Sequence, residues 1–405
     1  MGGLAESSDG GVLLRVCELF SGIGGWHAAL DLVSRQRQEL QFAVVLALDN
    51  NQEVNQVYAH NFPDTKVRQG NAELFTAAEM QSLNADMWLM SPPCQPYTRQ
   101  PGTRRGHTDA RAQSLFHIIR VLSRLPAAAQ PSFLLLENVQ GFEMSDARDE
   151  LCLVLRQSGY HLHEFLLSPM HFGIPNFRTR YFLTARKAAG GGNCIQGPLS
   201  FIPGREEHWC GGIRPLAEFL QRDLPPMAPL GGDGSNMGLY RQLLVSDDMK
   251  RKAWPYIDVV VPSSIYSNCF TKSYGRYAER AGSCLLVEPT AQQLHRQFCL
   301  PQLVCSREAR QPVEHVDAEP SANCWVDGRR PRKELRDYLD PSTSVLRYFS
   351  PREMLNLMGF PPWFSFPADG SLSVRQQIGM IGNAVNVRLV AELLHLVLSD
   401  RHMSD

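Results

Sequence analysis

The regular alternation of apolar and amphipathic stretches in the first half of the chain constrains its fold most. From Leu13 to about Arg186, short apolar runs typical of buried strands alternate with stretches of helical periodicity. Strands that alternate with helices pair in parallel, because each helix carries the chain back across the sheet. The predicted strands are Leu14–Leu19, Phe42–Leu48, Met87–Met90, Phe133–Leu136, His161–Leu167 and Tyr181–Ala185, and the predicted helices are Trp26–Arg35, Gln52–His60, Ala112–Leu125 and Asp146–Gln157. The sequence therefore predicts an α/β fold with a mostly parallel, doubly wound sheet.

The alternation ends near residue 187. Residues 187–260 are rich in loops and glycine, so a second, smaller region from about 187 to 343 is predicted to be inserted. Helical periodicity returns at Ser350, which precedes proline and stands three residues before Glu353, as at a capped helix N-terminus. A last helix is predicted at Val385–Leu398, and the glycine- and serine-rich residues 1–11 are predicted to be a disordered tail.

Composition excludes several classes of protein. The net charge of −1 gives no global sign of a nucleic-acid partner, so such a surface must be local. The ten cysteines form no close CxxC pair, which favours a reducing intracellular compartment over a disulfide framework and predicts no metal site. No apolar run reaches the roughly 18 residues that a membrane span needs.

A cysteine follows one predicted strand directly. The strand Met87–Met90 runs into Ser91, Pro92, Pro93 and Cys94. Proline has no N–H and a fixed φ, so the chain leaves the sheet here and places Cys94 at the carboxyl edge, where open α/β sheets bind their ligands. Cys94 is a candidate nucleophile. The alternative is a small buried hydrophobic residue, the commoner role of a free cysteine.

An acid and two arginines accompany this thiol. Glu137 ends the apolar run Leu134–Leu136, so a partly dry site should raise its pKa and make it a proton donor. It could instead cap the next helix. Strand alternation would place Arg178 and Arg180 on one face, suited to a polarised carbonyl or an anion, whereas a solvated edge strand is the alternative.

Glycines follow the first strand. Phe20, Ser21, Gly22, Ile23, Gly24 and Gly25 resemble a loop that lets a cofactor approach the backbone, although the third glycine of the dinucleotide fingerprint is absent. A nucleoside without a pyrophosphate is the better fit. Asp49 ends the second strand and could accept hydrogen bonds from both ribose hydroxyls. The alternative is a tight turn, with Asp49 capping the helix that follows.

Five motifs together resemble the cytosine-C5 methyltransferases. They are Phe20-Ser21-Gly22-x-Gly24-Gly25, Pro92-Pro93-Cys94-Gln95, Glu137-Asn138-Val139, Arg178-x-Arg180 and Gly382-Asn383-Ala384-Val385, in the family's order, and the resemblance covers roughly residues 13–186 and 345–400. It implies a Rossmann-like catalytic domain over 12–186 that binds S-adenosylmethionine and releases S-adenosylhomocysteine. It also implies a target-recognition domain over 187–343 and a segment 344–405 that completes the catalytic domain.

The resemblance assigns a role to each motif. Cys94 would add to C6 of cytosine, Glu137 would protonate N3, Arg180 would contact O2 and Arg178 would support the loop. The polar residues 99–111 resemble a mobile lid. The implied cofactor contacts are Phe20, Gly22, Ile23, Gly24, Gly25, Asp49, Asn71, Ala72, Glu73, Ser91, Asn383 and Ala384. Two positions depart from the family pattern, because many members have aspartate where Asn71 stands and glutamine where Asn176 stands.

The inserted region resembles the branch of the family that acts on transfer RNA. Cys269-Phe270-Thr271, with Leu166–Pro169 and Leu357–Pro362, carries this likeness. It implies methylation of an anticodon-loop cytosine, cytosine 38, best known in aspartate transfer RNA. The basic residues are local rather than global, as a structured RNA requires: Arg99, Arg104, Arg105, Lys272, Arg276, Arg280, Arg329, Arg330, Arg332 and Lys333. Ordinary solvated surface is the alternative for them.

Three other functions remain open on sequence. They are a DNA cytosine-C5 methyltransferase, a catalytically silent S-adenosylmethionine-binding adaptor and, as a fold-level option, a nicotinamide oxidoreductase. A silent adaptor would not need all four of the residues Cys94, Glu137, Arg178 and Arg180, so their presence argues against that function. The missing third glycine argues against a nicotinamide oxidoreductase. We expect a monomer in the cytoplasm and also in the nucleus, with weak binding to DNA and no membrane partner. The role of Cys269 stays open, either a structural thiol or a second active-site sulfur.

Overall fold

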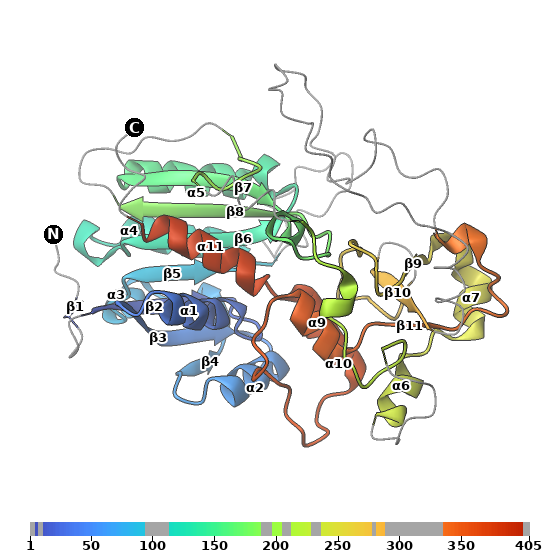
Figure 1. The fold of residues 1–405 in the computed structure, drawn as a ribbon. Coiled ribbons are helices and arrows are strands. Elements are labelled where there is room, and N and C mark those ends of the chain that lie inside the picture. Colours follow the sequence, from blue (N-terminus) through green and yellow to red (C-terminus); the bar gives the residue numbers. More distant parts are fainter. Residues whose placement is uncertain are drawn as a thin grey trace, which may run out of the picture.

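The computed structural model describes residues 5–6, 11–93, 113–187, 197–204, 212–227, 236–277, 281–287 and 335–399. Cys94, the predicted lid over 99–111 and the basic residues Arg280, Arg329, Arg330, Arg332 and Lys333 lie outside this description. The described chain forms a large part built on a central sheet and a smaller part beside it (Figure 1).

The large part is organised by one sheet. Its strand order is β4-β3-β2-β5-β6-β8-β7, and β8 is antiparallel to both of its neighbours, whereas β4, β3, β2, β5 and β6 are parallel. The strands are β2 (Val12–Leu19), β3 (Leu40–Asp49), β4 (Val67–Gln69), β5 (Met87–Met90), β6 (Phe133–Val139), β7 (Tyr160–Leu167) and β8 (Arg180–Lys187). The carboxyl ends of the five parallel strands therefore meet at one edge, and the start of β8 joins them there.

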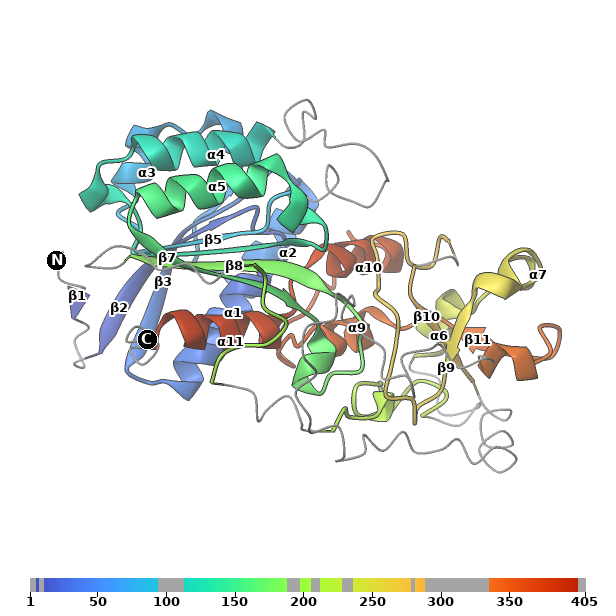
Figure 2. The same cartoon turned by 90° about the horizontal axis from the view of Figure 1, so that it is seen from above.

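Helices cover both faces of this sheet (Figure 2). One face carries α1 (Gly25–Gln36), α2 (Gln52–Asn61) and α11 (Val387–Val397), and the other carries α3 (Ala77–Ser82), α4 (Gln113–Arg124) and α5 (Asp146–Gln157). Alternation along β2 explains the two layers. Leu14 and Val16 enter the apolar cluster under α1 and α11, whereas Cys17 and Leu19 enter the cluster under α4 and α5.

The smaller part has a sheet of its own. It consists of β9 (Asp258–Val260), β10 (Ser283–Leu286) and β11 (Leu346–Arg347), in the order β11-β10-β9, with α6 (Met237–Leu243) and α7 (Asp247–Ala253). Because β11 pairs with β10, this sheet extends past residue 343, where the smaller region was predicted to end.

The chain returns to the large part through α9 (Pro351–Leu357), α10 (Val374–Asn383) and α11. The predicted cap at Ser350 is present, since its hydroxyl accepts the Glu353 N–H and Glu353 accepts the Ser350 N–H. Among the described residues, Val374–Val397 is one stretch that is long and apolar enough for a membrane span, but 78% of its window is buried inside the protein. It is a core element, interrupted between α10 and α11.

Most of the predicted elements are confirmed within two residues at each end, and β5 and α5 agree at both ends. Three expectations need correction. The strand β8 begins at Arg180, so Arg178 precedes it and is not part of it. The last helix begins at Val387, because Asn386 is its N-cap. In the predicted disordered tail, Ala5–Glu6 forms a short strand, β1, that pairs with β2.

Candidate active site at the carboxyl edge of the sheet

Sheet register brings the acid and one arginine together. In the parallel pair of β5 and β6, Met90 lies opposite Leu136, so Ser91 and Glu137 follow at neighbouring strand ends. In the antiparallel pair of β6 and β8, Val139 lies opposite Arg180. The prediction that these residues share one edge is therefore confirmed by backbone pairing alone.

Glu137 lies in a dry, cationic position. Its residue is 8% exposed, and its Oε1 lies 3.4 Å from the Nε atom of Arg180. Burial raises the pKa of the Glu137 carboxyl, although the charges of Arg180 and Arg178 oppose that rise. The raised pKa of Glu137 agrees with the sequence prediction for this residue. An acid with a raised pKa beside a fixed cation can hold a proton and give it to a neighbouring base.

The strand end that leads to Cys94 is tied to this acid. The side-chain amide of Asn138 donates to the carbonyl oxygen of Pro92 at 3.3 Å. Asn138 is the residue after Glu137, and Pro92 stands two residues before Cys94. The chain thus enters the Cys94 segment from a point fixed beside Glu137, while Cys94 itself lies outside the described residues.

Arg178 joins three parts of the chain that are far apart in sequence. Its guanidinium donates to the carbonyl oxygens of Phe270 at 3.2 Å, of Gly382 at 3.1 Å and of Ala384 at 2.9 Å. The residue is 4% exposed. Because these acceptors occupy its donors, Arg178 joins these segments structurally, and its implied support of the catalytic loop stays a prediction.

Cys269 lies between the two arginines. Its Sγ is 3.4 Å from Nη1 of Arg178 and 3.7 Å from Nη2 of Arg180. Burial by itself would raise the pKa of this thiol, but the charges and hydrogen bonds of both guanidiniums outweigh it and the net pKa is lowered. In Cys17 and Cys284, burial leaves the thiol pKa raised instead. The two arginines therefore converge, as predicted, but on a sulfur that sequence reasoning did not place.

A short run of backbone pairing puts Cys269 there. Phe177 forms a parallel bridge with Asn268, and the Phe177 N–H donates to the Ser267 carbonyl at 2.8 Å. The Asn176 side chain donates to Ser267 Oγ at 3.1 Å and to the Asn268 carbonyl at 3.0 Å. Asn176, one of the two departures from the family pattern, thus holds the segment before Cys269 against the segment before Arg178.

The glycine loop after β2 has the backbone that its sequence predicts. Gly22 and Gly24 have φ angles of 52° and 89°, in the region that favours glycine. The Gly22 N–H donates to Oδ2 of Asp49 at 3.0 Å, and the Asn51 N–H donates to Oδ1 at 2.9 Å. The helix α2 is capped by Asn51 rather than by Asp49. Asp49 therefore fixes the loop, and its proposed contact with a ribose stays a prediction.

The other predicted cofactor residues gather along the same edge. Ser91 Oγ accepts the indole N–H of Trp26 at 2.9 Å. Asn71 caps the 3₁₀ turn Ala72–Leu74 by accepting the Glu73 N–H. A Cβ on Gly25 would come within 2.7 Å of Val385, so the loop packs directly against the segment that follows Asn383 and Ala384.

The loop fits a polar ligand. A Cβ on Gly22 would meet no atom within 4 Å, so space is open beside this residue. Two buried polar atoms near it, Glu18 Oε1 and Ser21 Oγ, have no hydrogen-bond partner among the described residues. The other carboxylate oxygen of Glu18 accepts the Tyr58 hydroxyl at 2.7 Å, and burial raises the pKa of Glu18 to about 8.

Sequence reasoning missed Glu18, Trp26 and Tyr58. A glutamate inside an apolar strand was the available signal for Glu18, because a buried acid requires a partner. Nothing local signals Trp26 or Tyr58, which reach their partners across 65 and 40 residues of chain.

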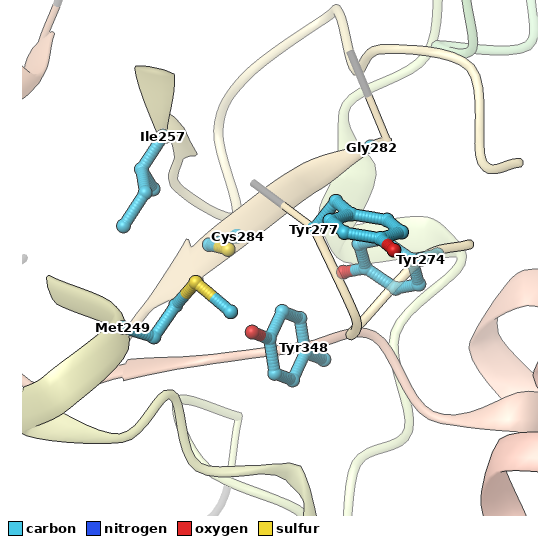
Figure 3. A pocket seen from close by; sticks show the side chains of 7 residues that line it. All are labelled: Met249, Ile257, Tyr274, Tyr277, Gly282, Cys284 and Tyr348. Atoms are coloured by element: carbon cyan, nitrogen blue, oxygen red, sulfur yellow. The ribbon is translucent and has the colours of Figure 1, made fainter. Parts of the chain in front are cut away.

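A small apolar pocket lies elsewhere, in the smaller part (Figure 3). Its lining residues are Met249, Ile257, Tyr274, Tyr277, Gly282, Cys284 and Tyr348. It has none of the edge residues described above. Within the described ranges, no group of three or more His, Cys, Asp or Glu side chains could hold a metal ion.

Comparison with known proteins agrees with the family resemblance that the five sequence motifs carry. The model of the C-5 cytosine-specific DNA methylase family matches residues 14–199 and 262–398. A tRNA (cytosine(38)-C(5))-methyltransferase from Bos taurus is 33% identical, over 95% of this chain and 99% of its own. A DNA (cytosine-5)-methyltransferase from Dictyostelium discoideum is 29% identical over 95% and 94%. The crystal structure of the Schizosaccharomyces pombe Dnmt2 methyltransferase superposes with a TM-score of 0.66 at 29% identity, over 95% of this chain and 98% of that one.

Proposed function

This chain belongs to the C-5 cytosine-specific DNA methylase family, and on that premise we propose that it methylates C5 of a cytosine in a transfer-RNA anticodon loop. The buried Glu137 beside Arg180, whose neighbour Asn138 binds Pro92 two residues before Cys94, carries the chemical part of the proposal. The named activity of the Bos taurus relative, over nearly the full length of both chains, supports transfer RNA and cytosine 38 as the substrate. Aspartate transfer RNA is the first species to test.

The residues at this edge suit a covalent route. The Cys94 thiolate adds to C6 of the cytosine, and its electron pair forms the C6–S bond. Glu137 donates its proton to N3, which keeps the ring from accumulating charge there, and C5 becomes nucleophilic. After methylation, a base removes the C5 proton, the C5–C6 double bond returns, Cys94 leaves as the thiolate and N3 gives its proton back to Glu137.

The target base must first leave its stack. Extrusion costs a few kcal/mol in a duplex and less for a base that is already unpaired, so an anticodon loop is an easier substrate than a duplex. Arg180, which contacts Glu137 and Cys269, would donate to the carbonyl O2 of the extruded cytosine.

The glycine loop is where we place the methyl donor. S-adenosylmethionine, when bound, supplies an activated methyl group. Gly22 has open space beside it, and Asp49 lies at the end of the next strand. In this proposal Asp49 would bind the ribose, and Asn71, Ala72 and Glu73 would contact the adenine. Ser91, Asn383 and Ala384 complete the edge.

Transfer of radiolabelled methyl from S-adenosylmethionine tests the proposal. Purified protein should label total transfer RNA and not duplex DNA, with the label mapping to an anticodon-loop cytosine. Cys94→Ala should abolish the label and leave S-adenosylmethionine affinity close to wild type. Full turnover by Cys94→Ala would exclude the covalent route.

A DNA cytosine-C5 methyltransferase is the second candidate, because the Dictyostelium discoideum relative has that name and a similar identity. Label confined to duplex DNA would favour it. Cofactor binding without label in either substrate would favour a silent adaptor.

A further inference from the structure

The segment after Cys269 leads from the catalytic edge to the surface within a few residues. Residues 271–277, here called the 271–277 turn, begin beside the arginine pair and end at the pocket of the smaller part. The turn contains two tyrosines, Tyr274 and Tyr277, together with Lys272 and Arg276, two of the basic residues that the sequence offered for RNA contact. The structure separates the role of one tyrosine from that of the other.

The turn is fixed at its start and in its middle. A Cβ on Gly382 would come within 2.6 Å of the Thr271 backbone, so the two segments are in direct contact. The Tyr274 hydroxyl accepts the Phe349 N–H at 2.9 Å and also donates to the Ser283 carbonyl. Tyr274 is 3% exposed and belongs to the core. A turn anchored in this way presents its outer side chains from a backbone that is held in place at Thr271 and Tyr274, which lowers the ordering cost of binding.

Three side chains of the turn face solvent. Tyr277 is 57% exposed, and the Arg276 guanidinium lies 5.4 Å from the centre of its ring. Lys272 is exposed as well. No carboxylate among the described residues pairs with Arg276 or Lys272. Figure 3 shows Tyr277 beside Tyr274, at the side of the pocket.

We propose that the 271–277 turn binds an unpaired nucleotide next to the target cytosine, with its base stacked on Tyr277 and its phosphates held by Arg276 and Lys272. The inference rests on the proposed function and adds to it the protein surface that binds the RNA loop nucleotides next to the target cytosine. An exposed aromatic ring with an arginine against it, on an anchored turn that also carries Lys272, has the chemistry that single-stranded nucleic acid requires. Duplex DNA offers no free base face to such a ring.

The test uses a fluorescent anticodon stem-loop RNA and the full-length protein. Tyr277→Ala should weaken binding about tenfold, since one stacked base contributes on the order of 1–3 kcal/mol. Tyr277→Phe should bind like wild type, because it keeps the ring. Tyr256 is the matched control, being a tyrosine of the smaller part with the same 57% exposure, and Tyr256→Ala should not weaken binding.

Two further readouts locate the contact. Photocrosslinking from 4-thiouridine, placed in turn at each position of the loop, should yield a crosslinked peptide that contains Tyr277. Arg276→Ala should lower the slope of log affinity against log salt by about 0.7, the value for one contact to a single-stranded phosphate.

The inference is wrong if Tyr277→Ala binds the stem-loop like wild type, or if Tyr256→Ala weakens binding equally. It would also be overturned if Tyr277→Ala weakened binding to duplex DNA but not to the stem-loop. Failure of the proposed function looks different, because the wild-type protein would then not methylate transfer RNA at all.

Discussion

Two buried glutamates, one in β2 and one in β6, have different surroundings. Glu18 and Glu137 both lie in the sheet, and burial raises the pKa of each carboxyl. Glu18 has a phenol as its partner, from Tyr58, whereas Glu137 has the charges of Arg180 and Arg178. The first acid is therefore stable as a neutral group, whereas in the second the charges of two guanidiniums oppose the rise that burial causes.

The difference separates a group that maintains structure from one that can exchange a proton. Without a nearby cation, ionisation in a dry site is costly, so Glu18 stays protonated through neutral pH. With two guanidiniums close by, Glu137 can lose its proton to a base and remain stabilised as the anion. Three substitutions test this comparison.

Glu137→Gln should give the largest effect. Glutamine keeps the shape but has no acidic proton, so single-turnover methyl transfer should slow by about 10²–10⁴-fold. Glu150→Gln on α5 is the control and should leave the rate unchanged. A normal rate in a folded Glu137→Gln protein would remove this residue as the proton donor.

Arg178→Ala should lower stability next. It removes the donor to the carbonyls of Phe270, Gly382 and Ala384 and leaves Cys269 with one counter-charge. The free energy of unfolding in urea should fall by about 3–5 kcal/mol. Arg120→Ala, at an exposed position on α4, should change it by less than about 0.5 kcal/mol. Equal losses for both variants would contradict the role assigned to Arg178.

Glu18→Gln should give the smallest effect, visible only as a pH dependence. The pKa of Glu18 is about 8 in the fold, against 4.5 for the unperturbed group, so its contribution to stability is full below about pH 4.5 and is lost as the pH rises through 8. Glutamine does not titrate, so the variant does not lose this stability as the pH rises. Between pH 6 and 8 the variant should gain about 2 kcal/mol relative to wild type in the free energy of unfolding. A constant difference across this range would show that Glu18 does not titrate there.

The strands and long helices could be predicted because each carries its own pattern. An apolar run such as Met87–Met90 contains no polar residue, so its bounds in the sequence are also the bounds of the strand. The strand β4 was missed because three residues with only Val67 half-buried give no period to detect. The helix α10 offered a usable signal, a capping box from Ser373 to Gln376, that was not used.

The site was predictable to the extent that it is local. Glu137 and the glycine loop stand at strand ends that the sequence marks, so their proximity follows from parallel pairing. Cys269 is different, because its contacts to Arg178 and Arg180 span 91 and 89 residues. No periodicity predicts a contact of that range, which depends on the bridge between Phe177 and Asn268 and on the hydrogen bonds of Asn176 to the same segment.

The contacts of Arg178 have a consequence for how the protein is made. A ribosome adds residues from the N-terminus, so the sheet, the acid and both arginines emerge before residues 382–384 do. Until then Arg178 has no Gly382 or Ala384 carbonyl to bind, and the glycine loop has no Val385 against it. The enzyme should become competent only once residues 382–385 have left the ribosome, and a shorter nascent chain should be unable to modify the transfer RNAs that are translating it.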